Sequence, residues 1–328
     1  DFWLGYFRRV RAQGACLSAG GYIAYYPTEI PLHYRSAWLG ETDPFGDLVA
    51  GCREMDMVVL ARTDPHAVHE DVYAAHPDWI AVDAEGKPRR HWSKPDAWVT
   101  CALGPYNYDF MTEVHREIVR RYRVDGIFSN RWAGHGICYC EHCLHNFHEA
   151  TGMDLPRTQD HKHARWRAYR AWRQARLFEI ADRWDREIRA IEPHACYIPN
   201  SGGGALSSLD MVALSERVPL LFADRQGRHG TMAPWAIGKN AKEYRAAFGG
   251  KPIGGIFSVG LEEKYRWKDS VQHGPELRVW VADAIANGMR PWFTKFAAQI
   301  WDDRWLGVVE DVFRWHAERS EERRVGKE

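Results

Sequence analysis

The sequence has no net charge and no long apolar run. Lys and Arg number 44, as do Asp and Glu, so the formal net charge is zero. A chain without a basic excess has no general attraction to nucleic acid or to an anionic membrane. No apolar run approaches the roughly 18–20 residues that cross a bilayer, and no leader opens the chain at Asp1. We expect neither nucleic acid nor a membrane as partner, and assign no compartment.

Internal repeats and low-complexity tracts are also lacking, which excludes a solenoid. Hydrophobic residues make up 45% and charged residues 27%, as is ordinary for a compact globular protein. The 16 tryptophans are abundant for this length. Their rings suit both a sugar cleft and a protein core. Those in loop-like segments are Trp79, Trp92, Trp98, Trp132, Trp235, Trp267, Trp301 and Trp305.

Short β-rich runs alternate with longer helical patterns along the chain, which predicts an α/β fold with a parallel sheet. The expected strands span residues 16–24, 57–62, 125–130, 195–200, 220–224, 253–258 and 291–295. The expected helices span residues 2–13, 45–54, 105–121, 163–192, 239–248 and 275–287. Pro193 ends the longest of them, and Gly288 is a C-terminal cap for the last.

The alternation leaves the parallel sheet either open or closed, and the closed form would be a (β/α)8 TIM barrel. Only seven strands are expected, so this fold needs a first strand before Asp1, lost by N-terminal truncation. We expect one domain over residues 1–317, with a β-hairpin insertion near 78–92. The charged tail over 318–328 lacks apolar periodicity and is expected to be disordered or artefactual. A barrel that lacks a strand exposes sheet edges, so a homo-oligomer is an open alternative.

Three cysteines crowd into six residues, at Cys138, Cys140 and Cys143. Thiolates bind zinc tetrahedrally at about 2.3 Å, and a C-x-C-x-x-C run supplies three of the four ligands. Cys101 is the first candidate for the fourth, followed by His142 or His145. We predict a structural zinc that staples the loop near 131–156, and no organic cofactor. A redox disulfide and free thiols are the alternatives.

The segment VDGIFSNRWAGHGICYCEHCLHNFHEATGMDLP, residues 124–156, resembles a hypothetical glycosyl hydrolase group related to the family 42 β-galactosidases. The pieces GGYIAYYPTEIPLHYRS, HPDWIAVDAEGKP, TCALGPYNYDFM and DDRW extend this resemblance over nearly the whole chain. The chain is also similar to the barrel of family 151 α-L-fucosidases. Both resemblances imply a TIM barrel that hydrolyses glycosidic bonds of a terminal sugar, β-galactoside-like or α-L-fucoside-like.

The resemblance also has implications for the metal and for assembly. In family 42 a zinc is held by a C-x-C-x-x-C run and an upstream cysteine, which match Cys138, Cys140, Cys143 and Cys101. Members of the related group often carry a trailing trimerisation domain. A homo-oligomer could therefore form through a C-terminal domain that this sequence does not include.

The sequence departs from these relatives at the end of the fourth barrel strand. Family 42 has Asn-Glu there, with the glutamate as general acid, whereas this chain has Asn130 and Arg131. Fucosidase-like barrels place an aspartate near Ser129 or Asn130, and neither residue is a carboxylate. The departure raises a second hypothesis, a carbohydrate-binding pseudoenzyme that keeps the barrel without the hydrolytic activity.

Glycoside hydrolysis needs two carboxyl groups, which in a barrel lie at the C-terminal ends of strands. We predict Glu262 as the nucleophile and Asp224 as the acid/base of a retaining enzyme. Arg225 and Arg228 beside Asp224 would instead favour Asp224 as the nucleophile. A hydrolytic role for the cysteine-bound metal is not expected, because four thiolates leave no open coordination position.

Further polar and aromatic residues lie at predicted strand ends or in the loops that follow them. They could bind sugar hydroxyls or stack on the sugar ring. These predicted substrate-binding residues are His33, Arg62, Asp64, Asn130, Arg131, Trp132, Lys295 and Asp303.

Overall fold

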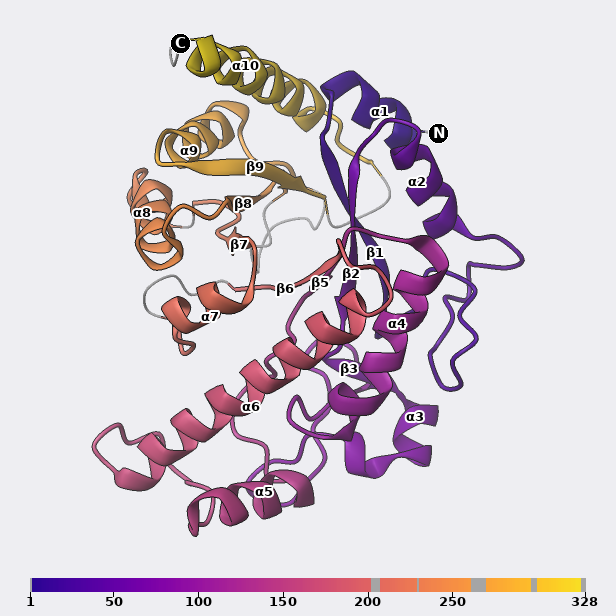
Figure 1. Cartoon of the computed structure of the whole chain (residues 1–328), viewed down its shortest axis with the longest axis vertical. Helices are drawn as coiled ribbons and strands as arrows, with labels where there is room; N and C mark the ends of the chain where they lie inside the picture. Colours follow the sequence, from indigo (N-terminus) through magenta and orange to yellow (C-terminus); the bar gives the residue numbers. More distant parts are fainter. Residues whose placement is uncertain (1, 202–206, 229, 261–269, 296–299, 326–328) are drawn as a thin grey trace. The chain divides into compact units, whose positions relative to one another are not determined.

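The structure, a computed structural model, describes residues 2–201, 207–228, 230–260, 270–295 and 300–325 (Figure 1). The chain divides into two compact units, Gly14–Asn200 and a second unit of Asp1–Gln13 with Ser201–Glu328. The single domain expected over residues 1–317 stays a prediction. Within the described ranges, no helix has the length and apolar character needed to cross a membrane.

The Gly14–Asn200 unit is built on a parallel sheet with the strand order β1-β2-β5-β6. Its strands are β1 (Gly14–Gly21), β2 (Val58–Asp64), β5 (Gly126–Ser129) and β6 (Cys196–Pro199). Every position of β5 and β6 is buried, as expected for parallel strands covered on both faces. Helices connect successive strands, as parallel pairing requires.

The helices of this unit begin and end at recognisable signals. The first, α2 (Pro44–Arg53), starts with a proline after Asp43, whose side chain accepts a hydrogen bond from Gly46 N at 2.9 Å. The next long helix, α4 (Met111–Tyr122), ends where Arg123 adopts a left-handed backbone. The longest, α6 (Ala164–Arg189), buries an apolar stripe that includes Trp172, Trp184 and Ile188.

A small antiparallel layer follows β2. In it, β3 (Ala67–His69) pairs with β4 (Ala97–Val99), and further antiparallel bridges join Val82 to Pro88 and Arg90 to Trp98. The hairpin expected near 78–92 falls within this layer. Between β3 and β4 lie a short helix, α3 (Glu70–Ala75), and the 3-10 turn η1 (Pro77–Trp79).

The second unit contains a parallel sheet with the order β7-β8-β9. Its strands are β7 (Leu221–Asp224), β8 (Ile253–Ser258) and β9 (Met289–Thr294). Its helices are α1 (Phe2–Val10), α7 (Met211–Arg217), α8 (Ala236–Phe248), α9 (Gly274–Ala286) and α10 (Trp305–Val325). In this unit α1 packs on α10, with the Trp3 and Trp305 rings stacked at 6.3 Å.

The predicted strands coincide with the observed parallel strands, but two expectations need correction. The tail over 318–328 was expected to be disordered or artefactual, yet α10 continues to Val325. Glu and Arg are good helix formers, so a charged segment without apolar periodicity can still extend a helix. The helix expected over residues 105–121 is also not uniform, because a π-helical turn, η2 (Tyr106–Phe110), precedes α4.

Candidate functional site

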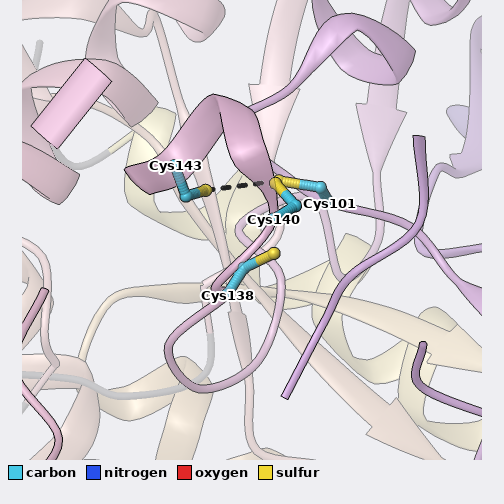
Figure 2. A group of neighbouring side chains, drawn as sticks. All are labelled: Cys101, Cys138, Cys140 and Cys143. Carbon is cyan, nitrogen blue, oxygen red and sulfur yellow. Dashed lines mark hydrogen bonds between the residues drawn. The ribbon is translucent and has the colours of Figure 1, made fainter. Parts of the chain in front are cut away.

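Four cysteine side chains converge in the Gly14–Asn200 unit (Figure 2). Cys101 follows β4, Cys138 and Cys140 lie in the loop after β5, and Cys143 lies in the first turn of α5 (Glu141–Thr151). Their sulfur atoms all lie within 4.8 Å of one another. The Cys101 sulfur lies 3.5 Å from that of Cys143 and 3.6 Å from that of Cys140.

These distances fit a metal ion and do not fit a disulfide. Four sulfur atoms about 2.3 Å from a central ion form a tetrahedron with edges of about 3.8 Å, whereas a disulfide needs about 2.05 Å. The Val82 amide donates to the Cys138 sulfur at 3.4 Å, a contact that suits a thiolate. The structure therefore brings together a four-sulfur donor set that could hold a metal ion.

The alternative ligands lie elsewhere. His142 faces Asp78 at 3.8 Å, and His145 faces Glu149 at 3.7 Å. Cys101 is thus the residue that the fold adds to the C-x-C-x-x-C run.

The thiols of the cluster differ in the direction in which their pKa values are shifted. Hydrogen bonds from Cys101 above all, and then from Cys140 and Cys143, lower the pKa of Cys138. The pKa of Cys101 is raised well above its usual range by its hydrogen bond with Cys138, and that of Cys143 by its hydrogen bond with Cys101. A cation at the centre would remove this competition, because metal-bound thiols lose their protons.

A second group of polar residues lies at the C-terminal ends of β2, β5 and β6. Arg62 binds both carboxylate oxygens of Asp64, with the Nη2–Oδ1 distance at 3.1 Å. Asn130 donates to Asp64 Oδ1 at 2.7 Å, and Asn200 donates to Asn130 Oδ1 at 2.8 Å. The parallel register, which aligns Thr63 with Ser129 and Ser129 with Pro199, brings these ends together. We call Arg62, Asp64, Asn130 and Asn200 the strand-end cluster.

Two histidines and a tryptophan lie beside the strand-end cluster. The His66 and His91 rings approach with their Nε2 atoms 3.3 Å apart. The Trp92 ring stacks on His91 with centroids 3.8 Å apart, and 58% of Trp92 is exposed. The predicted residue Arg131 places its guanidinium 4.5 Å from the Trp92 ring centroid. Arg131 therefore contributes to this aromatic group.

The structure places two predicted substrate-binding residues in the protein interior. His33 is 4% exposed, accepts a hydrogen bond from Gly21 N at 3.1 Å through Nε2, and contacts Thr28 Oγ1 through Nδ1 at 3.1 Å. Burial lowers the pKa of His33 to about 4. Trp132 is also buried, and its Nε1 donates to Asn200 O at 3.2 Å. Both side chains support the loops around the strand ends.

The predicted catalytic residues belong to the second unit. Asp224 is the last residue of β7, and its Oδ1 accepts a hydrogen bond from Gln226 at 2.9 Å. Arg228 forms an ion pair with Glu276, with Nη2 and Oε2 3.0 Å apart. Glu262 lies outside the described residues.

The two predicted substrate-binding residues of the second unit differ in exposure. Lys295 directly follows β9 and is partly buried. Asp303 is exposed, and its carbonyl oxygen accepts a hydrogen bond from Leu306 N at 2.9 Å where α10 begins.

Sequence reasoning missed Asn200, His66 and His91. Asn200 could have been found from the sequence. It ends a short apolar strand in the segment IPN, just as Asn130 ends one in the segment FSN. No local pattern pairs His66 with His91, since the pairing depends on the fold of the antiparallel layer.

A buried histidine between the sheet and α4 makes the stability of this unit depend on pH. His115 is 0% exposed, its Nε2 lies 3.1 Å from Thr63 Oγ1, and its Nδ1 has no hydrogen-bond partner. Burial lowers the pKa of His115 to about 3. Below a pH of about 6.5, the pKa of histidine in the unfolded chain, the unfolded chain binds a proton that the folded chain does not. The free energy of unfolding therefore decreases as the pH is lowered from about 6.5 to about 3.

We expect His115 to cost about 2 kcal/mol of unfolding free energy at about pH 5 relative to pH 7.5. In His115→Gln the amide retains a donor for Thr63 but does not titrate. Urea denaturation at the two pH values should therefore show a loss about 2 kcal/mol smaller in the variant. Equal losses in both proteins would contradict a buried neutral His115.

Comparisons with known proteins agree with this architecture. An α-L-fucosidase isoenzyme 2 from Paenibacillus thiaminolyticus superposes with a TM-score of 0.72 at 19% identity, over 95% of this chain and 45% of its own. A β-galactosidase from Bacillus circulans sp. alkalophilus superposes with a TM-score of 0.73 at 14% identity, over 95% of this chain and 52% of its own. The PgaB (BpsB) glycoside hydrolase domain from Bordetella bronchiseptica superposes with a TM-score of 0.71 at 10% identity, over 94% of this chain and 92% of its own. The chain thus spans about half the length of the first two relatives.

The parallel strands, the helical connections and these likenesses define an α/β protein with the TIM-barrel fold of glycosidases. Within that class, residues 4–131 match the family described as hypothetical glycosyl hydrolase 6, which confirms the resemblance drawn from the sequence. No curated protein matches the chain in sequence.

Proposed function

We propose that this protein is a glycoside hydrolase that releases a terminal sugar from a β-galactoside-like or α-L-fucoside-like substrate. The strand-end cluster is the observation that carries the proposal, since barrel enzymes place their sites at the C-terminal ends of strands. Arg62, Asp64, Asn130 and Asn200 combine donors and acceptors in one hydrogen-bonded row, as the recognition of sugar hydroxyls requires. The family match over residues 4–131 points to the same reaction class.

The proposed catalytic pair is Asp224 with Glu262. Of the two arginines that would favour Asp224 as the nucleophile, Arg228 is engaged by Glu276. The role assignment remains the one made from the sequence, with Glu262 as the nucleophile and Asp224 as the acid/base, and Arg225 still favours the reverse assignment. The Glu262 carboxylate attacks the anomeric carbon, while the Asp224 carboxyl gives its proton to the leaving oxygen as the glycosidic bond breaks. Water then displaces Glu262 from the sugar and returns a proton to Asp224, with net retention of configuration.

We further propose that the cysteine cluster binds a structural zinc. Cys101, Cys138, Cys140 and Cys143 would hold the ion, and the ion would cross-link the loop near 131–156 to the segment that follows β4. Four thiolate ligands leave no position for substrate or water, so the site has a structural role. We propose no organic cofactor.

Hydrolysis of a panel of nitrophenyl glycosides by the full chain tests the proposed function. We expect release of nitrophenol from the β-D-galactoside or the α-L-fucoside, and not from the opposite anomer of the same sugar. Silence across the panel, together with binding of the same sugars, would instead support the pseudoenzyme. Asn130 and Arg131 favour that second candidate, because they occupy the strand end where related barrels carry a carboxylate.

A further inference from the structure

The Asp64 carboxylate has a donor set that leaves one acceptor position open. Asp64 is the last residue of β2, and its side chain is 20% exposed. A carboxylate offers about four acceptor positions, two on each oxygen. Arg62 occupies one position on each oxygen, and Asn130 occupies the second on Oδ1. Among the residues that the structure describes, one acceptor position on Oδ2 is left for another donor.

His66 faces the same carboxylate. Its Nδ1 lies 3.7 Å from Asp64 Oδ1, too far for a hydrogen bond but close enough for electrostatic attraction. The His66 side chain is 14% exposed, and its Nδ1 is buried without a hydrogen-bond partner. Which ring nitrogen of His66 carries the proton therefore decides whether His66 attracts or repels the carboxylate.

Hydrogen bonds determine the location of that proton. The Ser93 amide donates to His91 Nδ1 at 3.2 Å, and the Ser93 hydroxyl lies 3.4 Å from the same nitrogen. We therefore assign Nδ1 of the neutral His91 as an acceptor without a proton, and Nε2 as the protonated nitrogen. His91 Nε2 lies 3.3 Å from His66 Nε2, which must then be the acceptor. The neutral His66 consequently carries its proton on Nδ1, directed at Asp64.

The surroundings keep both rings neutral, as this assignment requires. Trp92 stacks on His91 and on His66, at centroid distances of 3.8 Å and 5.5 Å. Burial, with smaller contributions from Arg131, His91 and Arg62, lowers the pKa of His66 to about 3. Burial and then Arg131 also lower the pKa of His91. Each ring therefore holds a single proton at neutral pH.

We propose that His66, oriented by His91, is a positioning residue for Asp64, and that the relay holds Asp64 Oδ2 ready to accept a hydrogen bond from a sugar hydroxyl. The proposal rests on the glycosidase function proposed above. It adds a directed row of donors that runs from the Ser93 amide through two imidazoles, and the last donor, His66 Nδ1, faces the carboxylate at 3.7 Å.

Imidazole NMR of the full chain tests the proton positions without any ligand. In a protein labelled with ¹⁵N-histidine, we expect His66 in the Nδ1–H form and His91 in the Nε2–H form. The signals are assigned by their loss in His66→Gln and His91→Gln. Asp64→Asn should shift the His66 Nδ1 proton, because it removes the facing carboxylate. The Nε2–H form at His66, or no response to Asp64→Asn, would overturn the relay.

Two substitutions of one residue test the positioning role. The Asn amide nitrogen superposes on imidazole Nδ1 and the Gln amide nitrogen on Nε2, so only His66→Asn keeps a donor toward Asp64. We expect affinity for methyl β-D-galactoside or methyl α-L-fucoside to fall about tenfold in His66→Gln and to be largely retained in His66→Asn. The exposed His194, altered in His194→Gln, is the matched control and should bind as the unaltered chain does.

The two tests separate the relay from the function. Equal losses in His66→Asn and His66→Gln would reject the positioning role even if glycosides bind and are hydrolysed. Failure of the unaltered chain to bind either glycoside would reject the sugar-binding role of Asp64 and the proposed function. The NMR spectra would still decide the proton positions in that case.

Discussion

Loss of metal from the four-cysteine cluster is expected to unfold the loop near 131–156 while leaving the parallel sheet of the Gly14–Asn200 unit folded. Structural zinc supplies about 10 kcal/mol or more of folding free energy in isolated zinc-binding peptides. Cys138, Cys140 and Cys143 lie in this loop and in the first turn of α5, whereas Cys101 lies outside it. A bound ion would thus join segments that depend on it, whereas the sheet keeps its own buried core.

Elemental analysis should find one zinc per chain, and none in Cys138→Ser or Cys143→Ser. Hydrogen exchange should then become fast over residues 131–156 and stay slow in β5 and β6. Cys16→Ser is the matched control, because Cys16 lies in β1 outside the cluster, and it should retain the zinc. Slow exchange in the loop after complete chelation would contradict a structural metal.

Substitution of the proposed catalytic carboxylates is expected to give the largest loss of activity. Removal of a general acid/base costs about 10²–10⁴-fold in rate, and removal of a nucleophile costs more. We expect kcat to fall about 10³-fold in Asp224→Asn with a poor leaving group, and turnover to vanish in Glu262→Gln. Circular dichroism must show both variants folded.

Leaving-group dependence distinguishes the two roles. A dinitrophenyl glycoside needs little protonation as it departs, so Asp224→Asn should form the glycosyl enzyme from it at nearly the unaltered rate. Glu262→Gln should stay inactive with the same substrate. Glu263→Gln is the matched control, since it alters the neighbouring carboxylate. Full activity in both Asp224→Asn and Glu262→Gln would refute the assignment, and loss of activity in Glu263→Gln alone would move the nucleophile to Glu263.

Much of the fold could be predicted because its signals are local. The strand that ends at Asp64 and the helix that ends before Pro193 are each specified by their own residues and their immediate flanks. The helical tail could not be predicted from apolar periodicity, because its Glu and Arg residues favour a helix without forming an apolar stripe. Near-complete agreement for the strands shows how strongly β-rich runs between turn residues indicate a parallel sheet.

The candidate site was predicted less completely, because its partners are distant in sequence. His33 and Trp132 follow predicted strands and were expected to bind substrate, but packing places both in the interior. Asn200 joins Asn130 only because β5 and β6 pair in register. Sequence position indicates which residues lie near a strand end, and packing decides which of them remain accessible.

The sequence by itself determined the parallel strands, their connecting helices and three of the four clustered thiols, since each depends on neighbours along the chain. For the fourth thiol the sequence offered Cys101 ahead of two histidines, and the tertiary structure places Cys101 in the cluster. The tertiary structure alone decided that Asp64 is bound by Arg62 and Asn130, and that His66 faces Asp64 beside His91. These contacts join segments far apart in the sequence. Their geometry is set by strand register and by the packing of the antiparallel layer, neither of which a local pattern encodes.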